Sequence, residues 1–224
     1  MTDTAPPFPP LSLLEDFLLL ALDESAGQFH PVPRSTFDCA TAAAVLMDLA
    51  LCNRIDNDLH EMFVINPAPT DDGLLDATLR LMSLTSEPRP VARWLRQVAE
   101  EAESLRDKAL QRLVTRGILR CEDKQILCVF HAASYPVNDR REGNAVKLRL
   151  LTTLLSADIP DSRDIVLVSL ADACGLFQQL LSASELASLT PRIEQIVKLD
   201  LVSQALRQAV DEIDAAMAMV TGLR

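Results

Sequence analysis

One arginine lies within an apolar helical stripe, and it is the residue whose surroundings define its chemistry best. The pattern predicts a long helix from about Trp94 to Arg116, and a rotation of about 100° per residue places Arg106 in the middle of its apolar side. The other members of that side are Leu95, Ala99, Ala102, Ala109, Leu110 and Leu113. A guanidinium among apolar side chains is costly unless it is paired. Arg106 therefore needs either an acidic partner or a phosphate.

Two partners for Arg106 stay open at this point. Glu103 lies three residues earlier on the same face, so an ion pair can form within the helix. Alternatively, Arg106 lines a surface pocket that binds an anionic group, and Arg34, Arg54 or Lys108 adds further positive charge. The Glu103 carboxylate would repel a phosphate there, so we expect the affinity for anions to be low.

The remaining groups of polar residues have simpler explanations. Cys128 and His131 have the spacing of half a zinc site, but no second pair lies nearby in the sequence, which favours core packing. Asp71, Asp72 and Asp76 lie at the start of a predicted helix, where capping and the helix dipole account for them. No nucleophile elbow, phosphate-binding loop or dinucleotide motif occurs. We therefore expect no catalysis, no metal ion and no cofactor.

Composition and charge limit the function further. The 224 residues are 49% hydrophobic and 24% charged, as in globular proteins, and with only 4% aromatic residues the core must be aliphatic. The 21 basic and 32 acidic residues give a net charge of −11, which disfavours a nucleic-acid partner. Five cysteines without a CxxC pair indicate a reducing compartment. No signal peptide and no apolar run of membrane-span length is recognised, so we expect a cytoplasmic location.

The elements that position these residues are predicted to be mainly helical. A Pro-rich, disordered tail over residues 1–10 precedes a single helical domain over residues 11–224. The first helix starts at a capping box, Ser12–Glu15, and an Ala-rich second helix covers about Thr36–Cys52. Between them, the prolines of Gln28–Pro33 predict an extended segment.

Two short hairpins interrupt the helices. Their apolar strands are expected at Met62–Ile65 and Ile126–Phe130. Further along, Ser182–Glu185 is a second capping box, and Thr190-Pro191 is expected to begin another helix with proline at its first position. The sequence thus predicts an all-α fold, a single helical globular domain with one or two short β-hairpins.

Several stretches, taken in order, resemble the Golgi phosphoprotein 3 family. They are similar to its opening helix, its helix-end signature, its loop-to-helix motif, a tryptophan that follows, and later short matches. These stretches are Leu11–Leu20, Asp48–Ile55, Ala68–Asp76, Trp94, Leu113–Leu119, Lys124–Gln125, Phe130 and Pro136. The resemblance covers roughly Leu11 to Leu206, which is most of the chain.

The resemblance implies an α-helical protein that sits on membranes by binding phosphatidylinositol 4-phosphate. In eukaryotic members a tryptophan, an arginine and two further basic residues form the pocket. These positions fall here on Pro33, Ala42, Glu103 and Arg106, so only Arg106 is matched, although a shift of one residue would bring in Arg34. Residues 1–33 contain no lysine or arginine, so we expect no counterpart of the basic tail that contacts coatomer in those members. We therefore expect a reduced or altered pocket, as in bacterial members of the family.

These observations favour a non-enzymatic peripheral membrane or adaptor protein on the inner face of a membrane, whose anionic lipid is bound by Arg106, Arg34 and Lys108. A first alternative is a protein–protein scaffold without lipid binding. The sequence names no protein partner, but the second hairpin near Glu122 is a candidate for self-association, because hairpin edges pair readily. A second alternative is a winged-helix-like DNA-binding regulator, whose recognition helix, Thr36–Cys52, would contain no lysine or arginine.

Overall fold

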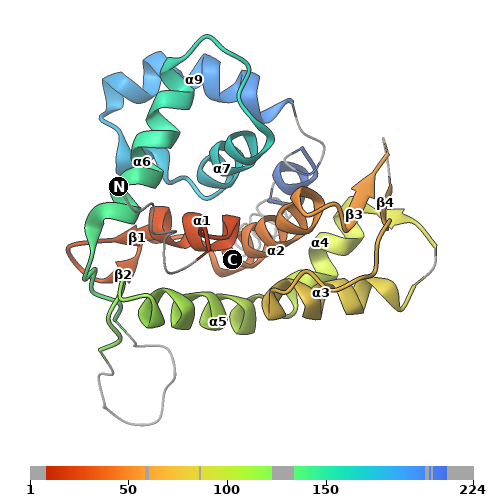
Figure 1. Cartoon of the computed structure of the whole chain (residues 1–224). Helices are drawn as coiled ribbons and strands as arrows, with labels where there is room; N and C mark the ends of the chain where they lie inside the picture. The colour runs from red at the N-terminus through yellow and green to blue at the C-terminus, as the bar shows by residue number, and fades with distance from the viewer. Residues whose placement is uncertain are drawn as a thin grey trace, which may run out of the picture.

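The computed structural model describes residues 9–58, 61–85, 87–122, 134–199, 202 and 204–210. This part of the chain is mostly α-helical, with a two-stranded and a three-stranded antiparallel sheet. The prediction of an all-α fold with short hairpins is confirmed. Helices α1 and α2 lie in the middle of the molecule, with α6, α7 and α9 on one side and α3 and α5 on the other (Figure 1).

Helix α1 (Leu13–Ala21) is the centre of this arrangement. Its N-cap Ser12 accepts a hydrogen bond from the Glu15 N–H while the Glu15 carboxylate accepts one from the Ser12 N–H, which confirms the predicted capping box. Every residue of α1 is buried, including the two acidic ones, Glu15 and Asp16. The helix packs against α2, α5, α6 and α7. A helix covered on all sides must satisfy its charged residues inside the protein.

Helix α2 (Arg34–Leu51) runs beside α1 and corresponds to the predicted second helix. Its alanines, from Ala40 to Ala44, are buried, and their small size lets α1, α4, α5 and α7 approach closely. The helix ends at Leu51 with Cys52 as its C-cap, and Asn53 follows with a φ of 53°, the left-handed conformation that often terminates helices.

A three-stranded sheet follows α2 and contains the first predicted hairpin. Strand β3 (Ile55–Asn57) pairs with β4 (Glu61–Val64), which pairs with β5 (Arg89–Pro90). Helix α3 (Gly73–Ser83) lies between β4 and β5 in sequence, and its N-cap Asp72 accepts a hydrogen bond from the Leu74 N–H. The buried Trp94 indole N–H donates to the Met62 carbonyl at 3.1 Å, which joins α4 to the sheet.

The single long helix predicted from Trp94 to Arg116 is wrong. The structure has two helices, α4 (Val91–Ala99) and α5 (Ala102–Thr115), separated by a turn at Glu100 and Glu101. Glutamate favours helix, so the local sequence contains no breaker. Helix α4 packs mainly on α2, whereas α5 packs on both α1 and α2, and the break lets each helix follow its own neighbours.

A hairpin that was not predicted joins α1 to α2. Strand β1 (Leu22–Asp23) pairs with β2 (Gln28–Phe29), where the sequence predicted an extended segment that begins at Gln28. The turn contains Gly27 at a φ of +64°, and its carbonyl accepts a hydrogen bond from the Tyr135 N–H at 2.7 Å. Two residues are too short a strand for periodicity to detect.

The predicted second hairpin at Ile126–Phe130 lies outside the described residues. The chain leading to it does pair with the chain that follows, through bridges Leu119–Val137 and Glu122–Ser134. Self-association through this hairpin therefore stays a prediction.

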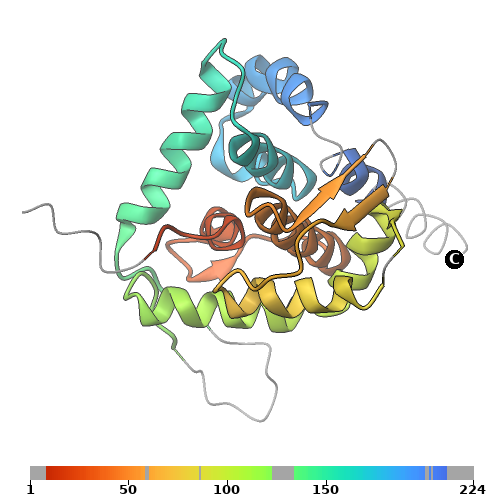
Figure 2. The same ribbon diagram turned by 45° about the vertical axis from the view of Figure 1, so that its right-hand side comes forward.

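The C-terminal half consists of α6 (Arg140–Leu155), α7 (Ser162–Ala173), α8 (Phe177–Leu180) and α9 (Ala183–Val197). The capping box at Ser182 is confirmed as the start of α9. The prediction of a helix beginning at Pro191 is wrong, because Pro191 lies inside α9. The capping box starts the helix about two turns before Pro191, and the helix continues through the proline. In the second view α6 forms one edge of the molecule (Figure 2).

Candidate functional site

Two arginines and two carboxylates of helices α2 and α5 meet close to the surface. We call them the α2/α5 cluster; its members are Arg34, Asp38, Glu103 and Arg106. Arg106 Nη1 lies 2.7 Å from Asp38 Oδ1 and donates to Thr41 Oγ1 at 3.1 Å. The guanidinium carbon of Arg106 lies 4.7 Å from the centroid of the Phe37 ring, within the range of cation–π attraction. The Arg106 side chain is only 11% exposed, so its positive charge is costly to bury, and the ion pair with Asp38 offsets that cost.

Glu103 binds the other arginine of the cluster. Its Oε2 lies 2.6 Å from Nη2 of Arg34. The Nε of Arg34 lies 3.8 Å from Oδ2 of Asp38. The ion pair expected between Glu103 and Arg106 is therefore replaced by one between α2 and α5, because Asp38 approaches Arg106 from the facing helix. The Arg34 and Glu103 side chains are 67% and 51% exposed, so their pair contributes at most about 1 kcal/mol. The four formal charges sum to zero.

The structure does not bring the third predicted residue, Lys108, to this cluster. Lys108 follows Arg106 by two residues, a rotation of about 200° around α5. It lines a different cavity of about 400 Å³, between the start of α3 and the second half of α5, together with Gln111 and Arg112. Arg54 is also elsewhere, donating to the Pro69 carbonyl at 2.9 Å. The sequence thus predicted the Arg34–Arg106 proximity but not the separation of Lys108.

A second group of charges, which was not predicted from the sequence, surrounds the start of α1. We call it the α1 network; its acids are Glu15, Asp16 and Asp48, and its bases are Arg112, Arg116, Arg149 and Arg163. Asp16 Oδ2 lies 2.8 Å from Arg149 Nη2 and 2.7 Å from Arg163 Nη2. Glu15 lies 3.3 Å from Arg112 Nε. These pairs connect α1 to α5, α6 and α7.

Asp48 of α2 has a special place in the α1 network. Its two carboxylate oxygens accept hydrogen bonds from the Leu13 N–H at 2.8 and 3.1 Å, which adds a second cap to α1. Arg163 Nη1 lies 3.6 Å from Oδ1 of Asp48. Burial nevertheless outweighs these contacts and raises the pKa of Asp48 to about 7. The signal in the sequence was the presence of three acids in apolar helices, which required basic partners.

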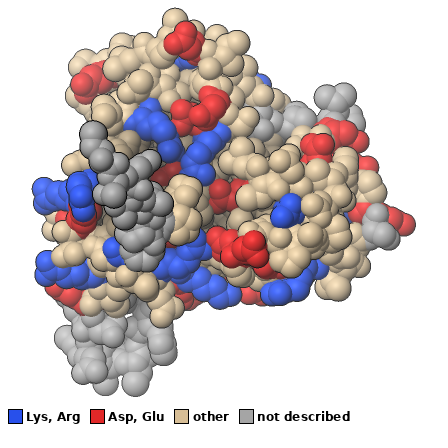
Figure 3. Space-filling view, viewed as in Figure 1, with Lys and Arg blue, Asp and Glu red and all other residues tan. Residues whose placement is uncertain are grey.

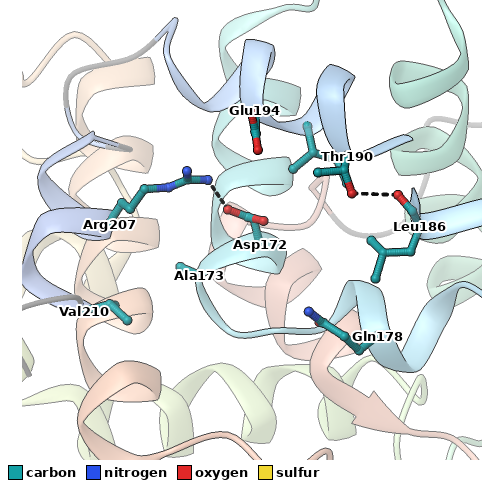
Figure 4. A pocket seen from close by; sticks show the side chains of 9 residues that line it. Asp172, Ala173, Gln178, Leu186, Thr190, Glu194, Arg207 and Val210 are labelled. Carbon is teal, nitrogen blue, oxygen red and sulfur yellow. Dashed lines mark hydrogen bonds and ion pairs between the residues drawn. The ribbon is translucent and has the colours of Figure 1, made fainter. Parts of the chain in front are cut away.

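A cavity of about 470 Å³ lies between α7, α8, α9 and the helical residues 204–210 (Figure 4). Asp172 and Arg207 form an ion pair on one side of it, and Glu194 lies nearby. Burial raises the pKa of Asp172. On the other side, the Thr190 hydroxyl donates to the Leu186 carbonyl at 2.7 Å and is thereby occupied. None of the residues that the sequence proposed for binding lines this cavity.

Comparison with known families decides what the chain is. The family model described as Golgi phosphoprotein 3 (GPP34) matches residues 13–213. The chain belongs to the Golgi phosphoprotein 3 family. The resemblance seen in the sequence is thereby confirmed, and the match begins at the first residue of α1.

The stretches that carried the family resemblance meet in the α1 network. Leu11–Leu20 contributes Glu15 and Asp16, and Asp48–Ile55 contributes Asp48. A third stretch, Ala68–Asp76, contains Asp72, which adjoins the network because its carboxylate accepts two hydrogen bonds of 2.8 Å from Arg112. In this member of the family, these stretches therefore share a structural task, which is to join α1, α2 and α3 to the arginines of later helices.

The four pocket positions carried over from eukaryotic Golgi phosphoprotein 3 proteins are not all accessible to a ligand here. Ala42 is fully buried and cannot contact a ligand. Pro33 is exposed and directly precedes α2, whose first residue is Arg34. Of the carried-over positions only Arg106 is basic, and Arg34, next to Pro33, is the second basic residue of the α2/α5 cluster.

Two further properties concern membranes and metals. Among the described residues, none of the helices combines the length and the apolar character that crossing a bilayer requires. In the same part of the chain, no three acidic, histidine or cysteine side chains are grouped in a way that could hold a metal ion. Cys128 and His131, the half zinc site of the sequence, lie outside it.

Proposed function

We propose that this Golgi phosphoprotein 3 family member is a non-enzymatic peripheral membrane or adaptor protein that binds an anionic lipid headgroup at the α2/α5 cluster, on the inner face of a membrane. The observation that carries the proposal is the convergence of Arg34 and Arg106 from two helices at one place. Exposed Arg34 makes the first contact with the headgroup phosphate. Phosphatidylinositol 4-phosphate is the headgroup that family membership suggests.

The two carboxylates of the cluster make this a weakened site. Asp38 and Glu103 occupy the guanidinium groups that a phosphate would need. A phosphate must displace Glu103 from Arg34, which is inexpensive because that pair is exposed to solvent. Displacing Asp38 from Arg106 costs more, since both groups are largely buried. Lys108, on the far side of α5, adds to the surface charge without touching the same phosphate.

Co-sedimentation with phosphatidylcholine vesicles, with and without phosphatidylinositol 4-phosphate, tests the proposal. One basic residue near an anionic surface contributes about 1 kcal/mol, so Arg34→Ala should weaken binding about fivefold. Glu103→Arg changes the charge by two and should strengthen binding about thirtyfold. Arg80→Ala is the matched control, because Arg80 is an exposed arginine at the end of α3.

The alternative function is a scaffold that acts through protein contacts alone. It is favoured by the charge balance of the cluster, which leaves no net positive charge for a lipid. If the wild type and Glu103→Arg both fail to bind the phosphoinositide vesicles, the lipid proposal is wrong and the scaffold remains.

A further inference from the structure

The outward face of helix α6 carries apolar side chains that cover nothing in the described structure. Val146, Leu150 and Leu154 point into the core, where the helix packs on α1, α7 and α9. Leu148 and Leu155, in contrast, are 66% and 74% exposed. A helix at the edge of a globular protein normally directs polar residues to solvent. Exposed groups of large aliphatic residues indicate a contact surface.

Five of the exposed residues of α6 form one continuous row along the helix. Residues seven apart differ by only about 20° in rotation and lie about two turns apart. Arg141, Leu148 and Leu155 have this spacing, and Ala145 and Thr152 fill the positions between them. All five residues are exposed. We call this row, together with Ile159 just after the helix, the α6 face; Ile159 is 89% exposed.

The one charged residue of the α6 face is basic, which suits an anionic partner. None of its six residues is acidic, in a chain with a net charge of −11, and the exposed acids next to it in sequence are Glu142 and Asp158. Its charged end is Arg141, whose side chain is 88% exposed and shares a pair with the N-cap Asp139 at 2.6 Å. Arg140 lies next to it, 3.6 Å from Glu24. Basic side chains gather over α5 and the N-terminal half of α6 in the space-filling view (Figure 3).

The size of the face distinguishes a membrane from a second protein. A stable protein–protein interface covers about 800 Å² on each partner, which three aliphatic side chains do not approach. Shallow insertion into a membrane interface needs no such area, because a few buried aliphatic groups act together with electrostatic attraction to anionic lipids. A basic residue at one end and leucines along the row suit that environment.

We infer that the α6 face inserts into the interfacial region of an anionic membrane. Leu148, Leu155 and Ile159 enter the boundary between headgroups and acyl chains, and Arg141 lies in the layer of lipid phosphates. The inference rests on the proposed peripheral membrane function, but it concerns a surface separate from the α2/α5 cluster and does not require a particular headgroup.

The test uses the full chain and vesicles of phosphatidylcholine and phosphatidylserine without phosphoinositide. Replacing Leu148 and Leu155 together by serine should weaken binding by about tenfold or more, since each inserted leucine loses apolar burial. Leu84→Ser is the matched control, because Leu84 is 84% exposed at the end of α3, and it should leave binding unchanged. Thermal unfolding should be unaffected in both variants, because these side chains support no core.

Insertion itself is measured with Leu148→Trp and lipids brominated on their acyl chains. The native Trp94 is buried, so quenching reports the new tryptophan. Strong quenching supports the inference. It is overturned if the tryptophan is not quenched, if the double serine variant binds as the wild type does, or if the wild type does not bind these vesicles. A wild-type dimer that the double variant abolishes in analytical ultracentrifugation would assign the α6 face to a second copy.

The outcomes for the two surfaces are separable. If only the α6 inference fails, Glu103→Arg still strengthens binding to phosphoinositide vesicles while the serine variant behaves as wild type. If only the headgroup proposal fails, the serine variant still loses binding to phosphatidylserine vesicles while Arg34→Ala and Glu103→Arg respond alike to vesicles with and without phosphoinositide.

Discussion

Replacing Asp48 by asparagine should change how the stability of the protein depends on pH. The carboxylate caps α1 through the Leu13 N–H and lies near Arg163, but burial raises its pKa from 3.8 to about 7. Asparagine retains a carbonyl oxygen for the Leu13 N–H and cannot ionise. The substitution therefore removes a titration while keeping the cap.

The magnitude follows from the two pKa values. The folded protein holds the Asp48 proton more tightly than the unfolded chain does. The stabilising contribution of this proton is fully present below the unfolded pKa and is lost as the pH rises through about 7. One pKa unit corresponds to about 1.4 kcal/mol, and about two units separate pH 5 from the folded pKa. The wild type should therefore lose about 3 kcal/mol relative to Asp48→Asn between about pH 5 and pH 8.

Urea unfolding followed by circular dichroism at the two pH values measures this difference. Only the change in the variant-minus-wild-type free energy matters, because the other titrating groups are common to both proteins. Asp107→Asn, at an exposed position of α5, is the control for replacing a carboxylate by an amide. A difference for Asp48→Asn that stays within about 0.5 kcal/mol across this range would refute the reasoning, since Arg163 would then outweigh burial.

Three further substitutions test individual contacts that stabilise the fold. Asp16→Ala leaves two partly buried arginines without their shared carboxylate and should cost about 3 kcal/mol or more in urea unfolding; a loss below about 1 kcal/mol would contradict the α1 network. Trp94→Phe removes the hydrogen bond to the Met62 carbonyl and should cost about 1–3 kcal/mol, whereas an unchanged melting curve would show that this contact is dispensable. Gly27→Ala places a Cβ 2.7 Å from Ser134 Oγ at a φ of +64°, so it should destabilise by at least about 1 kcal/mol; a neutral result would mean that this turn relaxes.

Local signals in the sequence were sufficient for most of the helices. The capping boxes at Ser12 and Ser182 and the end of the second helix near Cys52 depend on residues a few positions apart, so they could be predicted. The break between α4 and α5 could not, because the glutamates there favour helix and only the packing of the two helices on different neighbours separates them.

The partners of charged residues were the part that sequence reasoning could not supply. The apolar surroundings of Arg106 correctly required an acid or a phosphate, but the acid is Asp38 of a distant helix rather than Glu103 of its own. Similarly, Glu15 and Asp16 lie within the apolar segment Leu11–Leu22, and their burial depends on arginines of α5, α6 and α7. Periodicity assigns a side chain to a face of a helix, but it does not identify which helix that face meets.

The most direct test of headgroup binding observes the two arginines themselves. Short-chain, soluble phosphatidylinositol 4-phosphate can be titrated into nitrogen-15-labelled protein while the guanidinium Nε–H resonances are followed by nuclear magnetic resonance. We expect the resonance of Arg34 to shift first and that of Arg106 to follow, and both to shift at lower lipid concentration in Glu103→Arg, while the resonance of exposed Arg80 stays unchanged. Resonances of Arg34 and Arg106 that do not move, or that move no more than that of Arg80, would contradict binding at the α2/α5 cluster.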